Sequence, residues 1–107
     1  MRPRKIEFYV YILSSISGTL YVGLTDDLIK RVRQHKDGTY DSFTRKHQVN
    51  RLMYLEVFRD SKSERLREVQ IKEFRRENKI ALFIESNPNW EDLSSDLWGV
   101  KKARAGR

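Results

Sequence analysis

The chemistry that this sequence could perform starts with the tyrosines in its first quarter. Tyr9 and Tyr11 alternate with apolar residues in segment 6–13, and Tyr21 follows in segment 19–24. A tyrosine hydroxyl can orient a water molecule or a phosphate oxygen, or relay a proton if its pKa is lowered. Tyrosines on a β-hairpin also serve in packing and cross-strand pairing, so the residue type alone leaves both roles open.

Arg31 and His35 form a second pair, because they are one turn apart in the next expected helix. The planar guanidinium of an arginine is suited to holding a phosphate group. At the edge of a buried helix face, an arginine can equally extend into solvent or pair with a carboxylate. A histidine near the end of a helix can also simply cap that helix, so both residues have structural alternatives.

Glu68 is the candidate metal ligand, because it lies where the polar face of an expected helix meets the apolar face. A carboxylate held there against a sheet could present a hard oxygen ligand to a divalent cation. Glu64 and Lys72 lie four residues to either side of it, however, and such spacing is also typical of a solvated, charged helix face. Asn87 could orient this carboxylate, or form a turn before the anchoring ring of Trp90.

Three strands should position the tyrosines. The alternation of residue types predicts strands at 6–13 and 19–24, joined into an antiparallel hairpin by the turn residues 14–18. Segment 51–58 predicts a third strand. Gly23, inside the second strand, indicates a bulge or a place where another group approaches the backbone.

Two helices should position the charged residues. The first is expected to begin at a cap on Thr25 or Asp26 and to end at Gly38, and segment 38–50 is expected to be a polar loop. The second is expected to run from Ser61 or Ser63 to about Asn78, whereas the pattern of segment 79–84 does not decide between a helix and an extended piece. The buried positions expected for these helices are Leu28, Val32 and His35 in the first, and Leu66, Val69, Ile71 and Phe74 in the second.

The composition excludes several classes of function. The 107 residues include no cysteine, which excludes disulfides, cysteine zinc sites and thiol nucleophiles. No apolar run approaches the ~20 residues of a membrane span, and the N-terminal segment lacks a signal-peptide cleavage site, so we expect a cytoplasmic protein. We expect one domain at 6–98, between a flexible basic lead-in at 1–5 and a flexible basic tail at 99–107.

The net charge of +7 suggests a polyanionic partner such as nucleic acid. Seven positive side chains lie in segments 2–5 and 101–107, which leaves segment 6–100 neutral as a whole. Within it, segment 30–79 holds 15 basic and 8 acidic side chains. The candidate site residues of both helices therefore lie in a basic middle that the overall count hides.

Taken in order, these residues resemble the GIY-YIG nuclease family, above all its small single-domain bacterial members. The resemblance covers residues 7–93. It rests on Val10-Tyr11-Ile12, Tyr21-Val22-Gly23, Arg31, His35, Glu68 within Arg67-Glu68-Val69-Gln70-Ile71-Lys72, and Asn87-Pro88-Asn89-Trp90. Val10 and Val22 depart from the tripeptides of the family name, but both suit a strand and neither supplies a reacting atom.

The resemblance implies an α/β (α+β) fold with a small three-stranded antiparallel sheet flanked by helices. It also implies hydrolysis of phosphodiester bonds in DNA, branched or damaged DNA included, with one Mg²⁺ or Mn²⁺ ion held weakly in the absence of substrate. By matching position, Glu68 would bind the metal ion and Arg31 would hold the scissile phosphate. Tyr11 would be the general base or would orient the attacking water.

The remaining matched residues would support the same reaction. Tyr21 would contact phosphate or help to position the nucleophile, and His35 and Asn87 would support the site. Relatives act in repair, homing, restriction and junction resolution, so a role in repair or recombination is expected, with a protein partner as one means of targeting. The residues expected to bind nucleic acid are Arg31, Lys36, Arg45, Lys46 and Lys72.

Two alternatives to a nuclease stay open on the sequence. The chain could be a non-catalytic module that retains the nuclease fold and binds nucleic acid or a protein partner. It could also be a structural domain whose basic ends are incidental, in which case salt-sensitive binding to nucleic acid would be absent.

Overall fold

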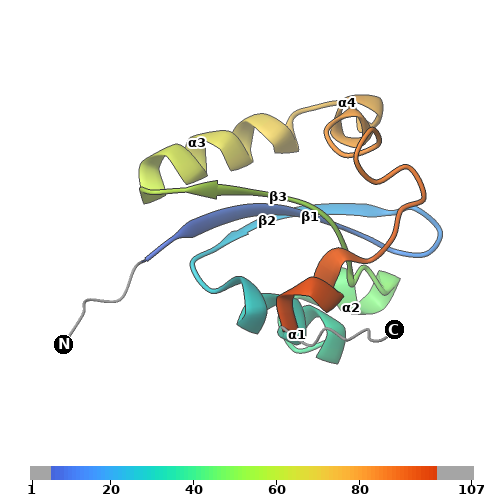
Figure 1. Cartoon of the computed structure of the whole chain (residues 1–107). Helices are drawn as coiled ribbons and strands as arrows, with labels where there is room; N and C mark the ends of the chain where they lie inside the picture. The colour runs from blue at the N-terminus through green and yellow to red at the C-terminus, as the bar shows by residue number, and fades with distance from the viewer. Residues whose placement is uncertain (1–5, 99–107) are drawn as a thin grey trace, which may run out of the picture.

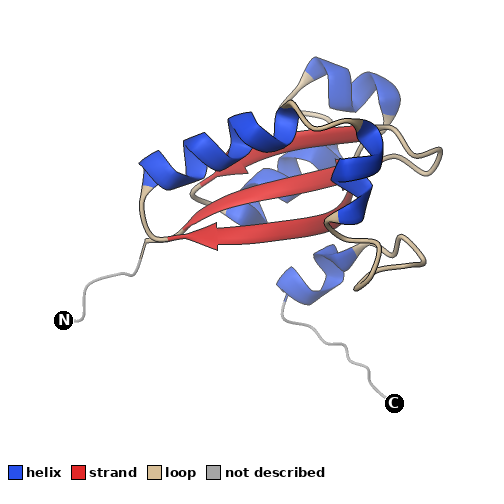
Figure 2. Cartoon of the chain, turned by 90° about the horizontal axis from the view of Figure 1, so that it is seen from above, coloured by secondary structure: helices blue, strands red, loops and turns tan. Residues whose placement is uncertain are grey.

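The computed structural model describes residues 6–98, and the lead-in and tail expected at 1–5 and 99–107 lie outside that range. Its centre is an antiparallel sheet of three strands in the order β2-β1-β3, formed by β1 (Phe8–Ser14), β2 (Leu20–Thr25) and β3 (Arg51–Phe58). Figure 2, which views the sheet from above, shows the strands running side by side. The predicted fold class and the three predicted strands are confirmed.

Helices cover both faces of this sheet. In Figure 1, α3 (Ser61–Lys72) and α4 (Arg76–Ala81) lie on one side, and α1 (Leu28–Asp37), α2 (Ser42–His47) and the 3-10 helix η1 (Leu93–Trp98) lie on the other. No helix within residues 6–98 is long and apolar enough to cross a membrane.

Two hydrophobic clusters result, because successive side chains of a strand point to opposite faces of the sheet. Val10 and Ile12 of β1 belong to the cluster on the α3 side, whereas Tyr11 and Leu13 belong to the cluster on the α1 side. All four side chains are fully buried. The central strand is thus covered on both faces, and this alternation decides which of its residues can meet α1.

Helix α1 begins one or two residues later than predicted, because its cap is Asp27 and not Thr25 or Asp26. The side chain of Asp27 accepts a hydrogen bond from the backbone N–H of Lys30 and caps the helix, while the hydroxyl of Thr25 accepts from the N–H of Asp27. Gly38 ends the helix with a left-handed φ of 73°. The predicted buried face of α1 is confirmed, because its buried residues are Leu28, Val32 and His35.

The loop predicted at 38–50 is wrong in its middle, where the structure has the short helix α2. Asp41 caps this helix by accepting from the backbone N–H groups of Phe43 and Thr44, and Gln48 ends it with a φ of 54°. A helix of six residues is too short to show a hydrophobic period, so its capping residues are the main local signal.

The second helix was predicted too long, and part of its predicted buried face is wrong. Helix α3 starts at an Asp60 cap and ends at Lys72. Leu66 and Val69 are 65% and 53% exposed, respectively, whereas the buried residues of α3 are Glu64 and Ile71. Glu64 and Ile71 are two turns apart and therefore share one face, so the sheet selects a face that the apolar residues of α3 do not mark.

Candidate active site

A cluster of aromatic rings lies on the α1 side of the sheet. The hydroxyl of Tyr11, on β1, is 3.0 Å from Nε2 of His35, on α1. The ring of Tyr21, on β2, is 5.3 Å from the His35 ring, and that of Tyr40 is 5.0 Å from it, both in edge-on arrangements. Both predicted site tyrosines and His35 therefore meet in space, and Tyr40 joins them from the segment before α2.

The hydrogen bonds around His35 assign its tautomer. The single hydroxyl proton of Thr44 is donated to the carbonyl of Asp41, 3.1 Å away, so Thr44 accepts from Nδ1–H of His35 at 3.0 Å. Burial and the nearby charge of Arg31 lower the pKa of His35 to about 4. The imidazole is neutral at pH 7, and its free Nε2 accepts the hydroxyl proton of Tyr11.

Both tyrosine hydroxyls stay protonated at neutral pH. Burial, together with the neighbouring Tyr21, raises the pKa of Tyr11, although Arg31 acts in the opposite direction. Burial and the charge of Asp41 raise the pKa of Tyr21 to about 12. The Tyr21 hydroxyl donates to Asp41 across 3.5 Å. In the free protein these phenols are therefore hydrogen-bond donors and not phenolates.

Gly23 lies directly opposite Tyr11 in the pairing of β1 with β2. A Cβ atom built at Gly23 would overlap the hydroxyl end of the Tyr11 ring. The close approach expected at this glycine is thus that of the Tyr11 phenol, which crosses the backbone of β2. Glycine is needed here for space, since its backbone is not in the left-handed region.

Arg31 borders the aromatic cluster and opens onto a pocket. One guanidinium nitrogen donates to the carbonyl of Leu24 at 3.1 Å, and Nε donates to the side chain of Gln34 at 3.2 Å. The guanidinium carbon lies 3.8 Å from the centre of the Tyr40 ring, which is a cation–π contact. These contacts hold Arg31 at the wall of a pocket of about 290 Å³, whose other lining residues are Phe8, Leu24, Thr25, Asp26, Tyr40 and Glu64.

Glu64 is a site candidate that reasoning from the sequence missed. Glu64 is only 3% exposed, and it lines the pocket beside Arg31. In the sequence it was noted only as a neighbour of Glu68, four residues away. The available signal was its spacing of seven residues from Ile71, the apolar residue of α3 that is fully buried.

Glu68 is not brought into the aromatic cluster. It belongs to α3, the helix on the opposite side of the sheet from α1, and forms a 2.5 Å ion pair with Lys72, one turn further along the helix. The Glu68 side chain is 12% exposed. Within residues 6–98, no hydrogen bond or ion pair links it to Tyr11, Tyr21 or Arg31.

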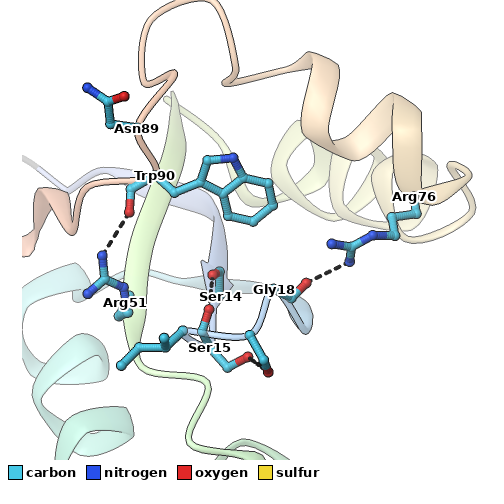
Figure 3. A pocket seen from close by; sticks show the side chains of 9 residues that line it. Ser14, Ser15, Gly18, Arg51, Arg76, Asn89 and Trp90 are labelled. Carbon is cyan, nitrogen blue, oxygen red and sulfur yellow. Dashed lines mark hydrogen bonds between the residues drawn. The ribbon is translucent and has the colours of Figure 1, made fainter.

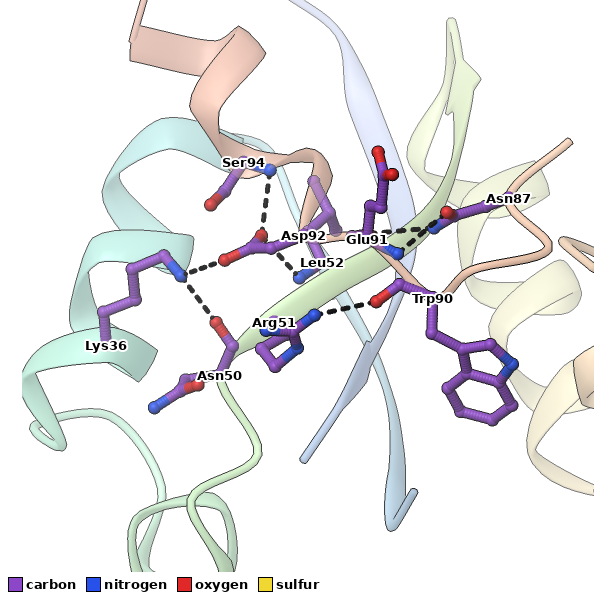
Figure 4. A network of polar contacts seen from close by, with 9 residues as sticks. All are labelled: Lys36, Asn50, Arg51, Leu52, Asn87, Trp90, Glu91, Asp92 and Ser94. Atoms are coloured by element: carbon purple, nitrogen blue, oxygen red, sulfur yellow. Dashed lines mark hydrogen bonds and ion pairs between the residues drawn. The ribbon is translucent and has the colours of Figure 1, made fainter. Parts of the chain in front are cut away.

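Asn87 also lies apart from the cluster, in the turn that follows α4. Its side-chain amide donates to the carbonyl of Glu91 and accepts from the N–H of Glu91, both at 2.9 Å (Figure 4). The amide is buried and also contacts the sulfur of Met53 on β3. These contacts close the turn 87–91 against the sheet.

The residues expected to bind nucleic acid differ in whether their side chains are already engaged within the fold. Lys36 donates to Asp92 at 2.7 Å and to the carbonyl of Asn50 at 2.8 Å, so its charge is used within the fold (Figure 4). Lys72 is paired with Glu68, and the side chain of Arg45 packs against Gly38. Lys46, on α2, is exposed.

A second pocket, of about 460 Å³, lies at the opposite end of the sheet, where residues of the β1–β2 turn form part of its lining (Figure 3). Arg76 donates to the carbonyl of Gly18 at 2.6 Å, and Arg51 donates to that of Trp90 at 2.8 Å. Both arginines thus hold segments distant in sequence together. Of the residues predicted for the active site, those of the aromatic cluster and Arg31 are the ones that the fold brings together.

Comparison with known proteins places this arrangement in a family. Residues 7–81 match the GIY-YIG catalytic domain. A UPF0213 protein of Staphylococcus saprophyticus is 40% identical over 78 residues, which are 72% of this chain and 94% of that protein. A UPF0213 protein of Halobacterium salinarum is 41% identical over 76 residues, which are 70% of this chain and 97% of that protein.

A solved structure is similar as well. The solution NMR structure of a UPF0213 protein of Bacillus halodurans has a TM-score of 0.52 and 27% identity, and the match covers 83% of this chain and 95% of that one. The predicted resemblance is thereby confirmed. With a family match that spans most of the described residues, this chain belongs to the GIY-YIG family and carries its nuclease-type domain.

Proposed function

We propose that this chain is a metal-dependent endonuclease that hydrolyses phosphodiester bonds in DNA. The observation that carries the proposal is the meeting of Tyr11, Tyr21 and His35 beside Arg31, which itself opens onto a pocket. A guanidinium and a set of phenols are the groups that can hold a phosphate and order a water molecule next to it.

Arg31 would hold the scissile phosphate, since its carbonyl and aromatic partners fix its orientation before substrate arrives. Tyr21 is only partly buried and would contact the same phosphate from β2. Tyr11 is fully buried, and its raised pKa disfavours a free phenolate. Its role would therefore be to hand its hydroxyl proton to Nε2 of His35, the acceptor it already contacts, as it takes a proton from the attacking water, so that no free phenolate remains.

Glu68 would be the metal ligand, by its match to the pattern of the family. No three acidic or histidine side chains gather as a metal cage within residues 6–98, so protein ligands for the ion are few. Mg²⁺ tolerates this because it retains several waters and takes oxygens from its substrate. When bound, such an ion lowers the pKa of a water molecule and counters the charge that develops on phosphate.

A cleavage assay tests the proposal directly. We expect the full chain to nick supercoiled plasmid and branched oligonucleotides with Mg²⁺ or Mn²⁺, and Glu68→Gln to abolish nicking. Glu73→Gln, at the C-terminal end of α3, is the control for the lost charge. Tyr11→Phe should also lose activity, whereas Tyr9→Phe, whose hydroxyl contacts Glu7 instead, should retain it. Undiminished cleavage by Glu68→Gln would contradict the assignment of the metal ligand.

A non-catalytic nucleic-acid-binding module is the second candidate. The observation that favours it is that the charge of Glu68 is engaged by Lys72, on α3, the helix on the opposite side of the sheet from α1. Binding without cleavage of duplex, branched and single-stranded DNA, in every metal, would support this alternative. A preference for branched or damaged substrates would instead favour a role in repair or recombination, with or without a targeting partner.

A further inference from the structure

The pocket of about 460 Å³ next to the β1–β2 turn has no part in the proposed reaction. Ser14, the last residue of β1, lines this pocket, whereas Phe8, the first residue of β1, lines the pocket beside Arg31. The length of β1 separates these two residues by roughly 20 Å. The volume falls within the range of about 300–1,000 Å³ that is typical of small-molecule sites. The pocket is thus a separate place with room for a ligand.

The lining of this pocket is positively charged. Arg51, on β3, and Arg76, at the start of α4, both line it, and none of its lining residues is acidic. Each guanidinium donates to one backbone carbonyl, that of Trp90 for Arg51 and that of Gly18 for Arg76. Neither arginine forms an ion pair with a carboxylate within residues 6–98. Because a guanidinium has five N–H donors, both arginines retain donors and charge for an anion.

The ring of Trp90 forms an aromatic wall of the same pocket (Figure 3). Trp90 has a φ of 54°, in the left-handed region that disfavours side chains other than glycine. Its N–H donates to the carbonyl of Asn87 at 3.2 Å, and Arg51 holds its carbonyl at 2.8 Å. Phe83 contacts the ring edge-on, and Trp90 stays partly exposed. Backbone strain that the surrounding structure maintains is common at sites that clamp a ligand.

The β1–β2 turn gives the pocket a fixed and open rim. The N–H of Ser15 donates to the carbonyl of Thr19 at 2.9 Å, and the hydroxyl of Ser15 accepts from the N–H of Thr19 at 3.0 Å. Ile16, which also lines the pocket, is 90% exposed, so the rim at the turn faces solvent. Asn89 is exposed on the other side, and its amide can donate to and accept from the edge of a base.

We propose that this pocket binds an unpaired nucleotide of a nucleic-acid strand, with its base on the ring of Trp90 and its phosphate between Arg51 and Arg76. Every nucleotide carries a flat aromatic face and a negative charge, and these are the two features that the lining complements. A base inside a duplex is stacked on its neighbours and cannot contact the ring. The pocket therefore selects unpaired nucleotides, and its occupation does not require that the chain cleave DNA.

The fluorescence of Trp90 supplies the first measurement. The chain has two tryptophans, so Trp98→Phe leaves Trp90 as the only one. The probe is a single-stranded thymidine pentamer, added without divalent metal so that no cleavage interferes. We expect it to quench Trp90 by stacking, with a Kd about tenfold or more below that of a blunt-ended duplex with the same number of phosphates. Binding of the pentamer without quenching of Trp90 would overturn the proposal.

Two neighbouring arginines provide a matched pair of variants. Arg76→Gln removes one charge from the pocket but can still donate to the carbonyl of Gly18. Arg75→Gln is the control, because the side chain of Arg75 is 83% exposed and does not line the pocket. We expect Arg76→Gln to weaken pentamer binding about tenfold and to reduce the slope of log K against log salt by about 0.7, as loss of one phosphate contact requires. Equal binding by the two variants would overturn the proposal.

Trp90→Leu tests the aromatic wall while keeping an apolar side chain against the core. Binding of a fluorescently labelled pentamer, followed by anisotropy, should weaken about tenfold, and unchanged binding would remove the ring from the site. Circular dichroism and Tm establish that the variant folds, and Arg51→Gln takes its place if it does not. Thymidine monophosphate is the second probe. If it bound as tightly as the pentamer, the pocket would take a free nucleotide and the assignment to a strand would be wrong.

Arg31→Ala distinguishes this pocket from the proposed active site. The variant should still show quenching of Trp90 by the pentamer, because Arg31 lines the other pocket. Loss of the quenching would mean that the two pockets are not independent, and would overturn the assignment of a separate site. If quenching depends on Arg76 but no DNA is cleaved with any metal ion, the nucleotide site stands and the proposed nuclease function fails.

Discussion

Two polar clusters of this molecule differ in what satisfies their hydrogen bonds. In the network around Asp92, one carboxylate oxygen accepts from the backbone N–H groups of Leu52 and Ser94, each at 3.0 Å, and the other pairs with Lys36 (Figure 4). In the cluster around Tyr11 and His35, side chains contact one another, and Tyr40 at its edge lines the pocket beside Arg31.

The difference separates structural polar groups from those available to a ligand. Asp92 ties η1 to the start of β3 and to α1, so its interactions are complete within the chain. Glu64 lines the pocket beside Arg31, and its buried Oε2 atom has no hydrogen-bond partner among the described residues. We therefore expect substitutions in the Asp92 network to change stability, and substitutions at the pocket to change binding and catalysis.

The largest expected effect belongs to Arg31→Ala. Loss of a group that stabilises charge in the transition state should reduce DNA cleavage about 10²–10³-fold. The fold should lose only about 1 kcal/mol, because the arginine makes few hydrogen bonds that end inside the protein. Single-turnover cleavage and urea unfolding measure the two effects, and Arg33→Lys on the exposed side of α1 is the control. A loss of stability without loss of cleavage would remove Arg31 from the site.

The next effect concerns pH and His35. Its pKa of about 4 in the folded chain lies below the value of about 6.5 expected for the unfolded chain, so the unfolded chain takes up a proton first as pH falls. The stability that the neutral His35 contributes is present above pH 6.5 and is lost as the pH falls towards 4. The free energy of unfolding decreases by up to about 3 kcal/mol over this range. Urea unfolding of His35→Gln should show a flatter pH dependence over this window. His47→Gln changes an exposed residue and should leave the pH dependence unaltered. If stability varied equally with pH in the unaltered chain and in both variants, His35 would not be a buried neutral imidazole.

Asp92→Ala should have a somewhat smaller effect, and on stability alone. It leaves the amides of Leu52 and Ser94 without their acceptor, which should lower the free energy of unfolding by about 2 kcal/mol. The rate of cleavage per folded molecule should stay the same. Asp92→Asn retains an acceptor oxygen and should lose less stability than the alanine variant. A change in the cleavage rate at full folding would end the distinction between the two clusters.

The smallest expected effect is that of Lys36→Met. The side chains of Lys36 and Asp92 are 30% and 26% exposed, so their ion pair is partly screened by water. We expect a loss of at most about 1 kcal/mol in unfolding free energy, decreasing at high salt. Binding of DNA should hardly change, because Lys36 is engaged within the fold. Weaker DNA binding by Lys36→Met than by Lys46→Met would restore the role that was predicted for Lys36 from the sequence.

Much of the fold could be predicted, because its signals are local. Alternation along β1 and the turn residues after it define the hairpin, and the apolar spacing of α1 marks its buried face. Helix α2 escaped prediction because six residues hold no full hydrophobic period. Leu66 and Val69 were wrongly predicted to be buried, because an apolar residue on a helix is buried only when the neighbouring sheet covers that face.

The candidate site also has a part that the sequence could predict and a part that it could not. The order of Tyr11, Tyr21, Arg31 and His35 in the chain was sufficient to identify the family, since the hairpin and the first helix bring these residues together through short connections. Glu64 could not be distinguished from Glu68 in the sequence, because both are glutamates on one helix among paired charges. Only the packing of α3 on the sheet shows which carboxylate faces the pocket beside Arg31.

The sequence by itself thus determined the family, the three strands and the residues on each face of β1, because strand alternation and motif order are properties of neighbours along the chain. The tertiary structure decided which polar groups are saturated, as Lys36 and Asn87 are, and which are not, as with Glu64. Saturation depends on backbone groups from distant segments, such as the amide N–H of Leu52, 40 residues away, from which Asp92 accepts a hydrogen bond. No pattern of adjacent residues contains that information.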